Sequence, residues 1–171
     1  MSMSFSIHPL GRAPRFAVDV SDLLEAPYQL GGVDPAHGID CLGVALAVHR
    51  RLGLFRPVYP VDRATAQNWL LGPGWTPLER DAAALRELGD VVVTEGGANA
   101  PMGVAVVFAL GRPTGAPTGA QGASGDPWLL TAQPKLGVRT LRASALWRNV
   151  GGPEGIRGCY RWRPVGPPAH Q

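Results

Sequence analysis

The segment that decides the fold spans residues 28–43, with the sequence Tyr-Gln-Leu-Gly-Gly-Val-Asp-Pro-Ala-His-Gly-Ile-Asp-Cys-Leu-Gly. Its first part is rich in turn residues, and it runs into Asp40, whose side chain suits the N-cap of a helix. Cys41 then falls in the first turn of an apolar helix. Because the helix dipole and unpaired backbone N–H groups favour a negative charge there, the position predicts a thiol that ionises easily. A nucleophilic cysteine would be placed in this way.

The composition is typical of one globular domain with a real core. The chain has 171 residues, of which 45% are hydrophobic and 17% are charged. The net charge is only +3, with no block of like charges, which argues against a nucleic-acid partner. The sequence contains no apolar run of about 18 residues, so we expect no membrane span. Residues 1–10 lack a basic segment followed by an apolar one, so we expect no secretory signal.

The two cysteines, Cys41 and Cys159, could form a disulfide in principle. Reduced thiols are the better expectation for a chain without an export signal. The sequence contains neither a Cys-x-x-Cys pair nor a His-Glu-x-x-His motif, so we predict no metal site and no cofactor.

Helical patterns come first in the chain, and strand patterns follow them. We expect helices over 21–25, 41–52, 62–71 and 82–88, and a helical turn over 143–148. We expect strands over 90–94, 104–110, 128–132, 137–141 and 156–162, with a loop over 112–127. This order predicts an α+β fold with N-terminal helices packed on an antiparallel sheet. We divide the chain into an arm (1–20), one domain (21–163) and a tail (164–171).

The run Pro27-Tyr28-x-x-Gly31-Gly32, followed by Gly38-Ile39-Asp40-Cys41-x-Gly43, resembles the nucleophile motif of the NlpC/P60 cysteine peptidases. Segments 88–93, 103–107 and 129–132 are similar to three strands of that family. The form Asp-Cys-Leu-Gly, together with Gly158-Cys159-Tyr160-Arg161, is most similar to the branch found in phage tails and phage-derived particles. The resemblance covers residues 20–163.

The resemblance implies a papain-like core and a thiolate that attacks an amide in the peptide stems of bacterial cell wall. In the family, a histidine on one strand activates the thiol, and a polar residue on the next strand orients that histidine. The matching positions here hold Gly103, or Met102 if the register slips by one residue, and Thr131. Tyr28 would back the nucleophile in the family, and here we also interpret it as a packed aromatic residue. We interpret Asp40 as a helix cap.

Another histidine could replace the missing base. His49 lies eight residues after Cys41 on the same predicted helix, which is roughly 12 Å along its axis and out of reach. His37, four residues before Cys41, is the candidate substitute base. His8 and His170 lie near the chain ends. Because the loss of general acid–base help typically lowers a rate by about 10²- to 10⁴-fold, Cys41 alone predicts a poor amidase.

We therefore expect a catalytically degenerate NlpC/P60-like protein that is a structural or docking component of a phage tail tip or phage-derived particle. Its partners would be tail or hub proteins and peptidoglycan, and it would be cytoplasmic during assembly and then part of a virion. An alternative is an active peptidoglycan endopeptidase that uses Cys41 with His37 or a base from a neighbouring subunit. A third hypothesis is a cytoplasmic acyltransferase or amidase. The five tryptophans are scattered, which favours core or interface anchors over a carbohydrate site.

Overall fold

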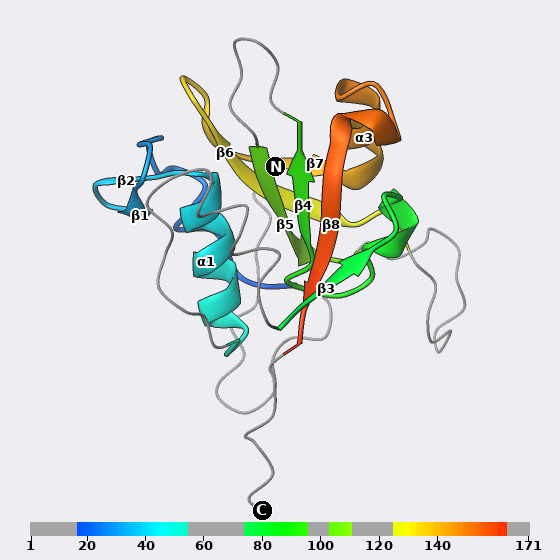
Figure 1. The fold of residues 1–171 in the computed structure, drawn as a ribbon. Helices are drawn as coiled ribbons and strands as arrows, with labels where there is room; N and C mark the ends of the chain where they lie inside the picture. The colour runs from blue at the N-terminus through cyan, green and yellow to red at the C-terminus, as the bar shows by residue number, and fades with distance from the viewer. Residues whose placement is uncertain (1–16, 55–73, 96–102, 111–124, 164–171) are drawn as a thin grey trace, which may run out of the picture.

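A six-stranded antiparallel sheet forms the centre of the molecule, in the strand order β3-β8-β4-β5-β6-β7 (Figure 1). The computed structural model describes residues 17–54, 74–95, 103–110 and 125–163. The strands of this sheet are β3 (Trp75–Leu78), β4 (Val91–Thr94), β5 (Gly103–Ala109), β6 (Trp128–Gln133), β7 (Gly137–Arg142) and β8 (Ile156–Trp162). The predicted α+β class with an antiparallel sheet is confirmed.

Within the described residues, two helices, two 3₁₀ turns and a small two-stranded ribbon accompany the sheet. The ribbon pairs β1 (Val33–Asp34) with β2 (Gly38–Ile39) immediately before helix α1 (Cys41–Arg51). Helix α3 (Ala143–Asn149) follows β7, and single 3₁₀ turns form η1 (Ala82–Ala84) and η2 (Pro153–Gly155). Within the described ranges, no helix is both long and apolar enough to cross a membrane.

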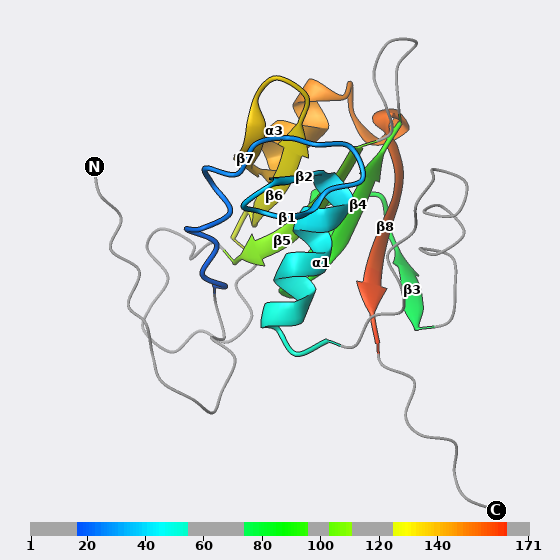
Figure 2. The same cartoon turned by 90° about the vertical axis from the view of Figure 1, so that its left-hand side faces the viewer.

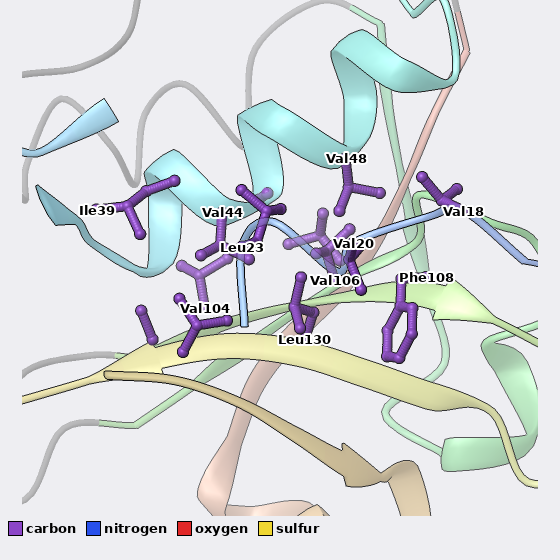
Figure 3. Close-up of a cluster of buried hydrophobic side chains, with 14 of the residues drawn as sticks. Val18, Val20, Leu23, Ile39, Val44, Val48, Val104, Val106, Phe108 and Leu130 are labelled. Carbon is purple, nitrogen blue, oxygen red and sulfur yellow. The ribbon is translucent and has the colours of Figure 1, made fainter. Parts of the chain in front are cut away.

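The two faces of the sheet each bury a hydrophobic cluster. On one face α1 lies across β5 and β6, as the two views in Figures 1 and 2 show, and Figure 3 shows Val44 and Val48 pointing from the helix towards the sheet. On the other face α3 contributes Ala143 and Leu146 to the second cluster. Because neighbouring residues of a strand point to opposite faces, each central strand contributes to both clusters.

The predicted helix over 41–52 is confirmed at both ends. Asp40 is its N-cap, and its carboxylate accepts a hydrogen bond from the Gly43 N–H at 2.8 Å. At the other end Arg50 and Arg51 lie in the last turn, where positive charge is favourable, and Gly53 takes a φ of 69°. The apolar residues between them are buried against the sheet, which explains why this segment is helical.

Two of the other predicted helices are wrong. Residues 21–25 form successive turns, in which Leu23 N–H bonds to Val20 O and Ala26 N–H bonds to Leu23 O, before Pro27 ends the run. Within 82–88 only the turn η1 is helical, because Leu85 is extended. The following N–H groups, of residues 86 and 87, bond to the Asp90 side chain instead of continuing the helix. The predicted helix over 62–71 lies outside the described residues.

The strand predictions agree with the structure more closely than the helix predictions do. The core also includes residues that precede the predicted domain. The predicted strands match β4, β5, β6, β7 and β8 to within a residue or two, and the predicted turn over 143–148 is the short helix α3. Val18 and Val20, which we assigned to the N-terminal arm, are buried beside β5, and Val18 N–H bonds to Phe108 O at 2.7 Å. Val18 and Val20 therefore belong to the core of the domain.

Candidate functional site

The loop before Cys41 is fixed to the start of α1 by the Asp40 carboxylate. One oxygen accepts the Gly43 N–H and the other accepts the Gly31 N–H, each at 2.8 Å. Asp40 is only 5% exposed, so these bonds satisfy a buried charge. The predicted capping role of Asp40 is confirmed, and the same side chain also holds the loop.

Close packing explains the glycines of the motif. A Cβ atom on Gly32 would collide with Gly38 O, and a Cβ atom on Gly43 would collide with Gly32 O. Gly38 takes a φ of 131°, which side chains rarely allow. The loop therefore lies directly on the first turn of α1, and only glycine fits at the contact points. These requirements come from the fold and need no catalytic role.

Cys41 is the first residue of α1, is half-buried, and packs at the edge of the α1-side cluster. Burial raises the pKa of its thiol to about 11, from an ordinary value of 9.0, and the nearby Asp40 charge raises it further. Backbone N–H groups, including that of Val104, oppose the shift but do not overcome it. The expectation of an easily ionised thiol is therefore corrected: at neutral pH the sulfur keeps its proton.

The structure places Gly103 and Thr131 on the sheet face away from α1. Val104 belongs to the α1-side cluster, so its neighbour Gly103 points to the opposite face. A Cβ atom on Gly103 would lie 2.7 Å from Thr94 Oγ1, to which the Gly103 N–H donates at 3.2 Å. Thr131 alternates in the same way between two members of the α1-side cluster, Leu130 and Ala132.

The residues that face α1 at these places are Val104 and Ala132, both buried in the α1-side cluster. Thr131 still contacts the strand that lies below Cys41, because its hydroxyl donates to Val104 O at 2.6 Å. The Val104 backbone thus contacts Cys41 through its N–H and Thr131 through its carbonyl. Met102, the other candidate for the histidine position, lies outside the described residues. Apolar side chains therefore occupy the sheet surface next to the thiol.

Neither described histidine is hydrogen-bonded to Cys41. His37 lies in the turn between β1 and β2, where its Nδ1 is 2.5 Å from Asp34 Oδ2, and its side chain is 84% exposed. The hydrogen bond from His37 lowers the pKa of the Asp34 carboxyl. His49 is fully buried, with its Nε2 2.6 Å from Gly89 O and its ring 5.9 Å from that of Trp75. His8 and His170 lie outside the described residues.

Tyr28 and the tryptophans contribute mainly to packing. Tyr28 is half-buried against the α1-side cluster and bridges to Ile39. The Trp75 ring meets the rings of Tyr160 and Trp162 edge-on, at 6.3 and 5.3 Å. Trp128 packs beneath the Arg142 guanidinium, and the Trp147 N–H donates to Arg80 O. Trp69 lies outside the described residues.

Cys159 is separated from Cys41 by the sheet. It lies in β8, is 1% exposed and belongs to the α3-side cluster. Burial raises the pKa of its thiol to about 12. Both cysteines are free thiols, and their positions on opposite faces exclude a disulfide between them.

A polar cluster around Asp90 was missed by sequence reasoning. Asp90 is 1% exposed and forms a bidentate pair with Arg161, at 2.8 and 2.6 Å. Its carboxylate also accepts the N–H groups of Arg86 and Glu87. Glu87 in turn pairs with Arg163 through two bonds of 2.7 Å, which lower the pKa of the Glu87 carboxyl. The cluster joins β8 to the start of β4. Asp90 and Arg161 are 71 residues apart in sequence, so local pattern analysis could not pair them.

Metal binding has no support in the part of the chain that the structure describes, where no group of three or more His, Cys, Asp or Glu side chains is arranged to hold an ion.

Comparison of the chain with protein-family models and with curated proteins gives no match. The resemblance to the NlpC/P60 peptidases therefore remains a prediction that rests on the motif and its order along the chain.

Proposed function

We propose that this protein is a catalytically degenerate NlpC/P60-like domain that acts as a structural or docking component of a phage tail tip or phage-derived particle. The observation that carries the loss of catalysis is the environment of Cys41. Its pKa is raised to about 11, and Val104 and Ala132 face α1 from the sheet where a base and its orienting partner would be needed. A thiol without a base cannot transfer its proton or protonate a leaving amine.

The motif remains informative without catalysis. Gly32, Gly38 and Gly43 serve the contact between loop and helix, and Asp40 serves the cap. A domain that kept its fold but lost its reaction would keep these residues. The assignment to a tail tip rests on the resemblance of the Asp-Cys-Leu-Gly and Gly-Cys-Tyr-Arg segments to the phage branch of the family.

The catalytic part of the proposal is tested with purified cell-wall sacculi. We expect wild-type protein and a Cys41→Ala variant to release equal, background amounts of soluble wall peptides. Release by the wild-type protein that disappears in Cys41→Ala would contradict the proposal.

The structural part is tested in the producing strain: deletion of the gene should remove complete particles, and a Cys41→Ala copy should restore them. Complete particles without the protein would end the structural assignment.

The alternative, an active endopeptidase, is favoured by one observation. His37 is held by Asp34 at 2.5 Å, and a carboxylate that orients an imidazole is the arrangement that a general base uses. For this alternative, His37→Ala and Asp34→Asn should both reduce wall digestion while leaving the fold intact. If wild-type protein digests sacculi and neither variant changes the rate, His37 is not the base.

A further inference from the structure

β7 is an open edge of the six-stranded sheet. It pairs with β6 over residues 137–142, and no strand lies on its other side in the described structure. In an antiparallel pair every second residue turns its N–H and C=O away from the neighbouring strand. Apart from the ladder that β7 forms with β6, no backbone hydrogen bond joins Val138, Arg139, Thr140 or Leu141 to another described segment. Among the described residues, the outward N–H and C=O groups of alternate β7 residues are therefore left for another strand.

β7 and the segments directly before and after it carry only positive charges. Residues 127–153 contain Lys135, Arg139, Arg142 and Arg148 and no Asp or Glu, although the whole chain has a net charge of only +3. Lys135, Arg139 and Arg148 are exposed, and none of the three forms an ion pair within the described residues. Arg142 is held in place over the Trp128 ring at 4.0 Å and by Asp126 O at 2.6 Å.

The opposite edge of the sheet, β3, differs in the features that matter for pairing. Pro77 has no N–H to offer a neighbour, so β3 has the kind of residue that protects an edge strand. β7 contains no proline, and Thr140 and Arg139 are exposed on its two faces. Exposed Leu136, at the tip of the β6–β7 hairpin, adds an apolar contact.

The charge decides which occupant fits. A second copy of β7 would place arginine opposite arginine, which is unfavourable. Charge complementarity does not favour the segments of this chain outside the described residues, because Asp62 is the only acidic residue among them. We propose that β7 is the docking edge for an extended acidic segment of a partner protein, which adds to the sheet as a seventh strand. This inference deepens the docking role proposed above and rests on it.

The proposal is tested with the full chain and a fluorescent peptide of alternating Glu and Val, about ten residues long so that it spans β7. We expect saturable binding by fluorescence anisotropy that weakens as salt is raised. Arg139→Glu should weaken binding by about five- to tenfold, through a lost attraction and a new repulsion. The control Arg50→Glu makes the same charge change at an exposed position of α1 and should leave binding unchanged.

Backbone pairing is tested separately from charge. Two versions of the peptide carry N-methyl groups at alternate residues, one on each edge of the strand, and both keep the charge of the parent peptide. We expect binding to be lost for the version methylated on the edge that pairs with β7 and to be retained for the other version. Equal binding of both N-methylated peptides, or tighter binding of single-stranded DNA than of the peptide, would overturn the proposal in favour of a simple polyanion surface. Absence of peptide binding would overturn it as well. None of these results bears on the sacculus experiment, so the two proposals fail separately.

Discussion

The two cysteines lie on opposite faces of one sheet. Their surroundings differ, but the pKa values of their thiols are raised in both cases. Cys41 begins a helix and has backbone N–H groups around its sulfur, whereas Cys159 lies within a strand among apolar side chains. Burial nevertheless raises both pKa values, to about 11 and about 12. The backbone N–H groups at the helix start lower the pKa of Cys41, but by less than burial raises it. At Cys41 the desolvation by apolar residues therefore outweighs the backbone N–H groups of the helix start.

The largest expected effect compares the cores of the two faces. Leu129 and Leu130 are neighbours in β6, both fully buried, and they point to opposite clusters. We expect Leu129→Ala and Leu130→Ala each to lower the free energy of unfolding by about 2–5 kcal/mol, measured by urea denaturation. A loss below about 1 kcal/mol for either variant would show that its face is not a packed core.

A smaller effect compares the starts of the two helices. Asp40 caps α1, and Asp126 accepts the Ser144 N–H at 2.9 Å in the first turn of α3. We expect Asp40→Ala to lower the free energy of unfolding by about 1–2 kcal/mol and Asp126→Ala by less, because only Asp40 is buried. Asp40→Asn keeps one accepting oxygen and is the matched control. An Asp126→Ala variant less stable than Asp40→Ala would reverse this ranking.

A third effect is a dependence of stability on alkaline pH. Between pH 9.0 and about 11 the unfolded chain releases the Cys41 proton while the folded chain keeps it, so stability should fall as pH rises through this window. The urea midpoint of the wild-type protein should therefore decrease with pH more steeply than that of Cys41→Ala. Identical slopes in the two proteins would mean that folding leaves the Cys41 pKa unchanged.

The features predicted well from sequence were those with local causes. Helix α1 follows from an apolar segment between Asp40 and Gly53, and β8 follows from a short segment that contains Ile156, Tyr160 and Trp162 and comes after a turn. β3 was missed because it includes Pro77, which is atypical of a strand. The Asp90–Arg161 pair was missed because its partners meet only through the pairing of β4 with β8.

At the candidate site, the sequence did not show which face of the sheet each residue occupies. The apolar run Val104–Val107 is buried on both faces, so it has no polar alternation from which a face could be assigned. Sequence matching therefore selected Gly103 and Thr131, whereas the residues that face α1 are Val104 and Ala132. The burial of Cys41 was hidden for a related reason, since it depends on strands more than 60 residues further along the chain.

The most direct test of this account is the ionisation of Cys41 itself. Wild-type protein is alkylated briefly with iodoacetamide across a pH series, and the peptides that contain Cys41 and Cys159 are quantified separately by mass spectrometry. We predict that Cys41 labelling is slow at neutral pH and rises with a midpoint near pH 11, as long as the protein stays folded. Rapid labelling of Cys41 with a midpoint at or below neutral pH would identify an activated nucleophile and contradict the proposal that the domain is catalytically degenerate.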